Sequence, residues 1–172
     1  MIYLLDASVL ITAHTTYYPI DRVPEFWDWL QHQARLGKIK VPQEIFEEIK
    51  DGPEEEGRDL LFDWITSEEV KNDLLLAEEA DPVLVAQVVN DGYANNLSDS
   101  EIEQIGRDPF LISYALSDRH NRCVVTTEVS KPSKQRQNKH IPDVCQGFGL
   151  TCINTFSLSR ELNFSTAWRA AP

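Results

Sequence analysis

Three acidic residues stand where predicted elements of the chain begin or end, and together they could bind a metal ion. Asp6 follows the apolar run at residues 2–5, which predicts a buried central strand of a parallel sheet. Glu48 lies on a predicted helix after a second strand, and Asp108 opens the helix before a third strand. Because the carboxyl edge of a parallel sheet gathers distant parts of a chain, these side chains can meet there.

Clustered carboxylates have a chemical consequence, because like charges repel and are seldom gathered without a cation. Hard oxygen ligands favour Mg²⁺ or Mn²⁺. Such an ion would neutralise the cluster and admit a phosphodiester. It would also activate water and stabilise the leaving oxygen of an in-line displacement. The three acids therefore predict a metal-dependent hydrolytic site.

Each of these residues also has an ordinary structural interpretation. Asp6 and Asp108 both stand at predicted helix starts, where an acid caps the helix. Glu48 has acidic neighbours and by itself would be a solvated surface residue. Thr126 and Thr127 fit a strand as β-branched residues. The metal-site hypothesis depends on all of these residues acting together.

The order of the predicted elements indicates an α/β fold with a mainly parallel central sheet, because strands alternate with helices. Residues 1–162 are predicted to form one domain, with a helical insert at 54–106 and a tail at 163–172. Within the insert, one helix begins at Pro82, and Ser98–Glu101 predicts a helix start with a capping box. Strands are expected at 2–5, 38–42, 122–127 and 149–154, and helices at 7–14, 24–36, 43–50, 54–66, 68–80, 108–116 and 158–162.

Length, charge and cysteine content restrict what kind of protein this can be. The 172 residues suit one domain, and the formal charge of -12 should repel nucleic acid unless cations or a local basic patch intervene. The 3 cysteines, without paired spacing, favour a reducing compartment. No apolar run approaches the roughly 20 residues of a membrane span, and the amino terminus lacks the basic region of a signal peptide. We expect a cytoplasmic protein without membrane association.

Four short motifs, in order along the chain, carry a resemblance to a known family. They are Leu4–Ser8, Val41–Ile49, Asp108–Ala115 and Val124–Glu128. The sequence resembles the PIN domain family, the metal-dependent ribonuclease fold of many VapC-type toxins. The stretch at 139–145 is similar to a PIN-like branch of poorly known function. The resemblance implies a three-layer α/β/α fold, an RNA substrate, and Mg²⁺ or Mn²⁺ as cofactor.

The resemblance also implies roles for individual residues. Asp6, Glu48 and Asp108 would hold the metal, and these acids with Thr126 would form the catalytic group. Ser8 and Thr126 would steady the site through hydroxyl hydrogen bonds.

Two positions in the motifs have alternatives. Glu48 fits the family's placement six residues after the proline of its motif, and Glu44 and Glu47 lie nearby. Family members often carry an Asp shortly after the threonine at the end of the third strand. Glu128 occupies the corresponding place here, and Asp143 is the other candidate for a fourth metal-binding acid.

A basic segment follows the third strand and should lie beside the acidic site. Such a loop could grip a phosphate backbone while the metal acts on the scissile group; the alternative is a surface loop without that role. Ser8 and Thr127 are predicted to contact substrate as well. The basic residues of the segment are Lys131, Lys134, Arg136 and Lys139.

The predicted function is a metal-dependent endoribonuclease that acts as the toxin of a toxin-antitoxin pair. The resemblance implies an antitoxin protein that blocks the site, and the acidic surface suits a basic segment in that partner; many such toxins form homodimers. The alternative is a non-catalytic PIN-like protein-binding module, which the large acidic insert and the absence of an Asp near Thr126 favour. A DNA nuclease is a further enzymatic alternative.

Overall fold

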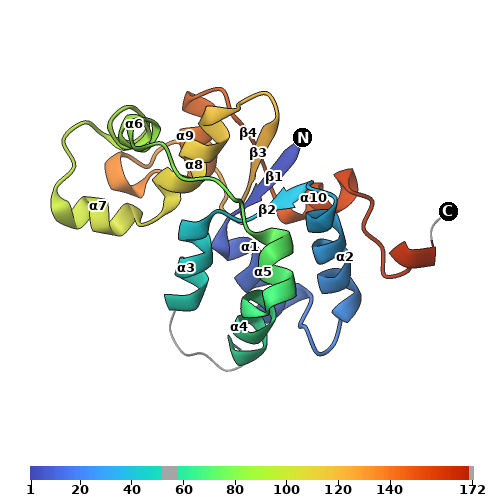
Figure 1. Ribbon diagram of the computed structural model, residues 1–172. Coiled ribbons are helices and arrows are strands. Elements are labelled where there is room, and N and C mark those ends of the chain that lie inside the picture. The colour runs from blue at the N-terminus through green and yellow to red at the C-terminus, as the bar shows by residue number, and fades with distance from the viewer. Residues whose placement is uncertain (52–57, 171–172) are drawn as a thin grey trace.

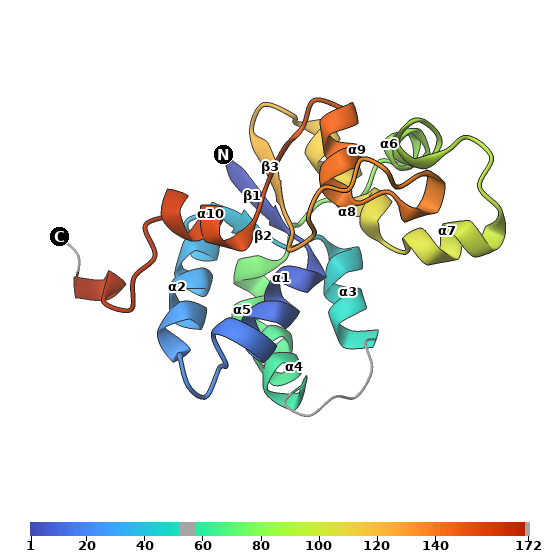
Figure 2. The same cartoon turned by 180° about the vertical axis from the view of Figure 1, so that it is seen from behind.

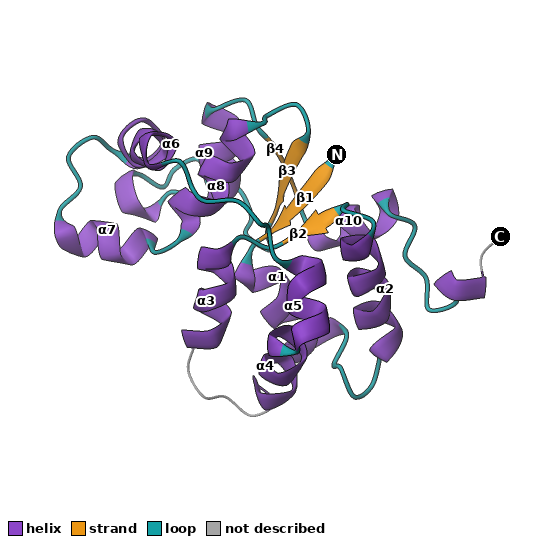
Figure 3. Ribbon diagram, viewed as in Figure 1, coloured by secondary structure: helices purple, strands orange, loops and turns teal. Residues whose placement is uncertain are grey.

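Four parallel strands form the central sheet of the computed structural model, which describes residues 1–51 and 58–170. The strands lie in the order β2-β1-β3-β4, so β1 is inside the sheet, with Leu4 aligned to Lys40 on one side and to Val124 on the other. The predicted parallel sheet is confirmed, and its carboxyl ends share one edge (Figure 3). The strands are β1 Ile2–Leu5, β2 Ile39–Lys40, β3 Arg122–Val125 and β4 Thr151–Ile153.

Helices cover both faces of the sheet in a three-layer α/β/α arrangement (Figures 1 and 2). No helix within residues 1–51 and 58–170 is long and apolar enough to cross a membrane. The α-helices are α1 Ala7–Thr12, α2 Pro24–Arg35, α3 Gln43–Asp51, α4 Arg58–Thr66, α5 Glu68–Leu74, α6 Pro82–Gln87, α7 Asp99–Ile105, α8 Asp108–Ser117, α9 Ile141–Gly147 and α10 Thr155–Glu161. Shorter helical turns are η1 Ala13–Tyr17, η2 Val88–Tyr93, η3 Arg136–Asn138 and η4 Trp168–Ala170.

The core forms because the apolar strands are enclosed by these layers. Leu4 and Leu5 of β1 are fully buried, α8 packs along β3 and β1, and α9 packs on β4. On α2, the ring of Phe26 stacks on Tyr18 with ring centroids 4.3 Å apart and contacts Phe164 edge to face. This packing ties the segment after β4 to α2.

The predicted tail at 163–172 is in fact packed against the domain in its described part. Trp168 donates its indole hydrogen to the backbone oxygen of Glu25 at 3.0 Å, and Arg169 pairs with Asp28 at 2.8 Å. Both partners lie on α2. Local sequence patterns could not predict this contact because the partners are far apart along the chain.

The predicted helical insert divides between two parts of the fold. In Figures 1 and 2, α4 and α5 lie with α1, α2 and α3, whereas α6 and α7 lie with α8 and α9. The predicted helix at 68–80 is wrong beyond Leu74, because the chain there runs extended beside Val41. Val41 N donates to the Leu74 oxygen at 2.8 Å, and Leu76 N donates to the Val41 oxygen at 2.9 Å. Residues 54–57 of the predicted first insert helix lie outside the described residues.

Asp91 and Gly92 were predicted to end the helix that begins at Pro82. The helical chain instead continues through both residues as η2.

The capping box at the start of α7 is confirmed. The Ser98 hydroxyl and the Glu101 carboxylate each accept a hydrogen bond from the backbone N–H of the other residue. Gly92 lies where η2 contacts α9, and only a hydrogen at this position leaves room for that contact.

We expect Gly92→Ala to lower the free energy of unfolding by about 1–3 kcal/mol, because an added methyl group overpacks the contact with α9. A Cβ at this position would lie 2.8 Å from Val144 Cγ1 and 2.9 Å from Phe148 Cε2. Urea denaturation measures the change. Gly147→Ala is the matched control, since a Cβ there meets no atom within 4 Å. Equal destabilisation by the two substitutions would refute the close contact at Gly92.

Candidate metal-binding site

Asp6 stands directly after β1, at the carboxyl edge of the sheet, and two hydroxyl groups hold its side chain. Ser8 Oγ donates to Asp6 Oδ2 at 2.5 Å, and Thr126 Oγ1 donates to the same oxygen at 2.8 Å. Asp6 is 5% exposed and its side chain makes no capping bond to α1. The capping interpretation is therefore wrong, and both hydroxyl groups bind Oδ2 rather than Oδ1.

The same hydroxyl groups join the segments that follow β1 and β3. Thr126 Oγ1 also accepts a hydrogen bond from Glu128 N at 3.1 Å. Ser8 Oγ accepts one from Thr127 N at 3.3 Å. Ser8 and Thr126 thus make the hydroxyl hydrogen bonds that the family resemblance implied. Asp6 is oriented by contacts from both strand ends.

Asp108, the first residue of α8, lies within a group of carboxylates. The pKa of Asp108 is raised to about 8, most by burial and then by the charges of Asp6, Glu128 and Glu48, in that order. Tyr93 Oη donates to Asp108 Oδ2 at 3.3 Å, which partly offsets the effect. Asp108 occupies the first helical turn and not the cap position, so capping does not explain it. Acids from four separate elements act on one another at this edge.

Glu48 reaches the group from α3 and has an unsatisfied oxygen. Burial raises the pKa of Glu48, and the charge of Asp6 raises it as well. Glu48 Oε2 is buried and has no hydrogen-bond partner. Because a buried, unpartnered carboxylate oxygen is costly, it fits a position that a cation would satisfy.

Arg107 explains why Glu47, a neighbour of Glu48 on α3, does not belong to the group. The Arg107 guanidinium donates to the backbone oxygen of Glu44 at 2.6 Å, to Glu47 Oε2 at 3.1 Å and to Asp51 Oδ2 at 2.8 Å. Glu47 is thereby held on the outer side of the helix. Of the acids considered in this motif, Glu48 is the one that acts electrostatically on Asp108.

Glu128 and Asp143, the two candidates for a fourth acid, have different surroundings. Glu128 raises the pKa of Asp108, and its Oε2 accepts a hydrogen bond from the first backbone amide of α9 at 2.7 Å. Asp143 accepts hydrogen bonds from Ser130 Oγ at 2.5 Å and from Lys131 N at 2.8 Å. Asp143 therefore holds the loop after β3, and Glu128 is the acid that joins the other three.

The basic segment is divided between structural contacts and exposed side chains. Arg136 donates to both carboxylate oxygens of Glu101, each at 2.8 Å, and Lys139 Nζ donates to a backbone oxygen of η2 at 2.6 Å. These two residues fasten the loop to the predicted insert. Lys131 and Lys134 are exposed. Arg136, although paired, keeps 42% of its side chain exposed.

The four carboxylates, Asp6, Glu48, Asp108 and Glu128, form what we call the acidic cluster. In the part of the chain that the structure describes, no three His, Cys, Asp or Glu side chains stand close enough to share an ion without adjustment. The donor set, all hard oxygen, fits Mg²⁺ or Mn²⁺.

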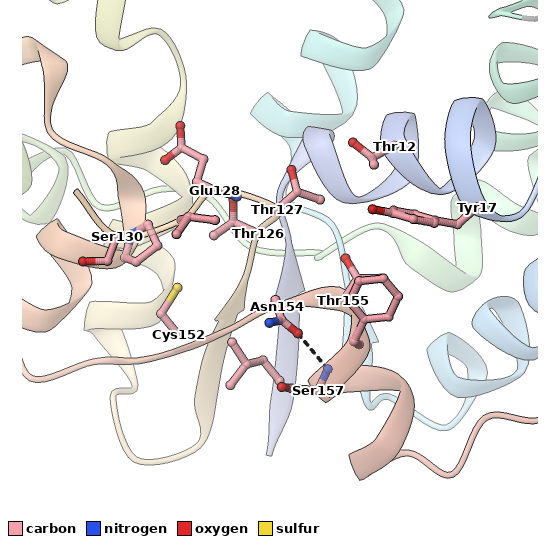
Figure 4. A pocket seen from close by; sticks show the side chains of 14 residues that line it. Thr12, Tyr17, Thr126, Thr127, Glu128, Ser130, Cys152, Asn154, Thr155 and Ser157 are labelled. Atoms are coloured by element: carbon pink, nitrogen blue, oxygen red, sulfur yellow. Dashed lines mark hydrogen bonds between the residues drawn. The ribbon is translucent and has the colours of Figure 1, made fainter.

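A pocket of about 550 Å³ adjoins the acidic cluster at the ends of β3 and β4 (Figure 4). It is lined by residues 126–130, by residues 154–157 at the start of α10, and by Thr12 and Tyr17. Sequence analysis missed residues 154–157 as a candidate site. The signal was present, since they follow a parallel strand and so lie at the same sheet edge as Asp6.

Comparison with protein-family models matches residues 3–166 to DUF4411, described as a domain of unknown function. The matched span contains the whole acidic cluster. A search of curated proteins gives no match.

We expect Asp108→Asn to stabilise the metal-free protein, and to do so more at high pH. Since folding raises the pKa of Asp108 from 3.8 to about 8, its contribution to stability is full below the unfolded pKa and is lost as pH rises through the folded pKa. Removing the carboxyl avoids that loss. Thermal unfolding in a chelator should show a gain in Tm at about pH 9 that exceeds the gain at about pH 5 by at least about 3 °C.

Asp63→Asn serves as the control for this measurement, because Asp63 is an exposed acid on α4. It should change Tm by similar small amounts at both pH values. A gain from Asp108→Asn that does not depend on pH would contradict the electrostatic description of the acidic cluster.

Proposed function

Because the chain belongs to the DUF4411 family, a domain of unknown function, we propose from the acidic cluster itself that the protein is a metal-dependent endoribonuclease. The carrying observation is the convergence of four acids at one sheet edge, with Glu48 Oε2 buried and unpartnered. The resemblance of the four sequence motifs to the PIN domain family supports the same activity. The reaction class is hydrolysis of an RNA phosphodiester.

In this proposal the acidic cluster holds Mg²⁺ or Mn²⁺, which when bound supplies activated water and stabilises the leaving oxygen. Ser8 and Thr126 keep Asp6 in one orientation through their bonds to Oδ2, and Oδ1, which accepts neither bond, would be the oxygen that holds the ion. Asp108, with its pKa near 8 in the absence of a cation, gives up its proton when one binds, because metal ligands must be deprotonated. Metal affinity should therefore rise with pH through neutrality.

The charge of the protein limits how RNA approaches. A formal charge of -12 repels a phosphate backbone, so neutralisation of the acidic cluster by the cation is a condition for binding. Lys131 and Lys134 are exposed on the loop after β3 and would attract the RNA backbone near the site.

We further propose that the protein is a cytoplasmic toxin of a toxin-antitoxin pair and forms a homodimer. A basic segment of the antitoxin would occupy the acidic site.

The proposed activity is tested by comparing RNA cleavage by two variants, Glu48→Gln and Glu47→Gln. Both residues lie on α3, but only Glu48 belongs to the acidic cluster. We expect Glu48→Gln to reduce Mn²⁺-dependent cleavage of mixed structured RNAs by about 100-fold or more, because changes even to the partners of metal ligands cost about 10–100-fold. Glu47→Gln should retain most of the activity, since its exposed ion pair with Arg107 contributes little. Gel analysis of the products measures both rates, and Asp6→Asn should behave as Glu48→Gln does.

The same assay separates the alternatives. Cleavage of DNA strands of identical sequence, without cleavage of RNA, would identify a DNA nuclease. Metal binding without cleavage of either substrate would favour the protein-binding module. Equal cleavage by wild type and Glu48→Gln would remove the acidic cluster as the place of the chemistry.

Thr126→Val tests whether the hydroxyl bonds position Asp6. We expect the affinity for Mn²⁺, measured by calorimetry, to fall by about 10-fold, because second-shell bonds orient metal ligands. Thr127→Val is the matched control, since Thr127 contributes only its backbone N–H to these contacts. Unchanged affinity in Thr126→Val would argue that Asp6 is positioned by the backbone alone.

A further inference from the structure

The pocket beside the acidic cluster is built by four parts of the chain that are distant in sequence, one of which contributes Pro142 alone. Thr12 and Tyr17 come from α1 and η1, residues 126–130 follow β3, and residues 154–157 follow β4 (Figure 4). Glu128 belongs to both the pocket and the acidic cluster, so the two adjoin. The volume of about 550 Å³ lies within the range of about 300–1,000 Å³ for small-ligand pockets.

The lining of the pocket is almost free of charge. Among the described residues that line it, Glu128 is the one carboxylate, and none is Lys, Arg or His. The remaining polar groups are hydroxyls, a thiol and an amide. Since a phosphate group would need cationic partners or clustered amide donors, this lining favours a neutral ligand that offers hydrogen-bonding edges.

Exposed apolar side chains gather around this pocket. Tyr17 and Phe156 are each 47% exposed, and Val129 is 69% exposed. The rings of Tyr17 and Phe156 meet edge to face with centroids 5.2 Å apart and planes at 71°. This arrangement leaves ring surface available at the pocket, and exposed aromatic faces are the surfaces on which unpaired bases stack in single-stranded nucleic acid complexes.

Two polar side chains in the pocket have capacity for a ligand. Thr155 is 6% exposed, yet its Oγ1 is buried without a hydrogen-bond partner. Asn154 Oδ1 accepts a hydrogen bond from Ser157 N at 2.9 Å, which fixes the amide and leaves its Nδ2 as a donor (Figure 4). A hydroxyl and an amide donor beside aromatic rings suit the edge of a base and the hydroxyls of a ribose.

We propose that this pocket binds one unpaired nucleobase and its ribose, adjacent to the phosphodiester at the acidic cluster. The inference rests on the proposed ribonuclease function and gives it a substrate class, namely RNA that is single-stranded at the cleavage position. A paired base cannot enter the pocket, because its edge is occupied and its faces are stacked. In this proposal, binding of the base in the pocket, and not the charge of the protein, positions the RNA strand at the acidic cluster.

Binding of neutral ribonucleosides tests the pocket without any metal. Adenosine, guanosine, cytidine and uridine are added singly at millimolar concentration in a chelator, and the amide resonances of Asn154 and Thr155 are followed by NMR. We expect at least one nucleoside to shift these resonances in the wild type. Phe156→Leu keeps an apolar side chain but removes the aromatic face, and should weaken that binding by about 5-fold or more.

Two further variants make the result specific. Val83→Ala changes another exposed apolar residue, on α6 and outside the pocket, and should bind nucleosides as the wild type does. Asp108→Asn removes a member of the acidic cluster and should also keep nucleoside binding while losing metal-dependent cleavage. In cleavage assays, Phe156→Leu should raise the KM for single-stranded RNA by about 5-fold or more with a smaller change in kcat, and the wild type should prefer single-stranded RNA to duplex.

The outcomes for the two proposals are distinct. Unmoved resonances with every nucleoside, or equal binding by wild type and Phe156→Leu, would overturn the pocket assignment even if Glu48-dependent cleavage is observed. Nucleoside binding that depends on Phe156, in a protein that cleaves no RNA, would uphold the pocket and reject the ribonuclease.

Discussion

Repulsion among four carboxylates at one edge of the sheet is the constraint on which the arrangement of this protein depends. Asp6, Glu48, Asp108 and Glu128 come from different elements. Burial, followed by the charges of the other three acids, raises the pKa of Asp108 to about 8. A cluster of this kind persists only where the surrounding structure holds it, because each acid would be more stable in water. The central position of β1 and the buried core beneath it provide that support.

Basic side chains near the acidic cluster make their hydrogen bonds to groups outside it. Arg107 precedes Asp108 in sequence, yet its guanidinium is bonded to the outer side of α3 and to Asp51. Arg136 and Lys139 face the predicted insert. The hydroxyls of Ser8 and Thr126 contact Asp6 without neutralising it. Arg107 still lowers the pKa of Glu48 through its charge, although its hydrogen bonds go to other groups.

The sequence predicted those features whose cause is local. A continuous apolar run located β1, and acids at element ends located Asp6 and Asp108, because strand and helix boundaries follow from neighbouring residues. Residue types also identified the capping box at Ser98. Neighbouring residues could not show whether Glu128 or Asp143 is the fourth acid. That depends on the hydrogen bonds that Glu128 makes to α9 and that Asp143 makes to the loop at Ser130.

Contacts between distant residues explain the remaining differences. The extended pairing of Leu74 and Leu76 with Val41 replaced the end of a predicted helix, because backbone hydrogen bonds to a neighbouring strand outweighed helix propensity there. Arg136 was expected to face RNA, but its partner Glu101 lies 35 positions away in the chain. Residues 154–157 could have been placed at the sheet edge because they follow a predicted parallel strand, but their position beside residues 126–130 depends on β4 lying next to β3.

The strand order has a consequence for synthesis of the chain. β1 is made first but lies inside the sheet, and its longer neighbour β3 leaves the ribosome only after every residue of the predicted insert. Until then the nascent protein carries an apolar strand with an open edge, and such edges pair readily with other chains. Chaperone protection during translation is therefore most valuable in the interval between the emergence of β2 and that of β3.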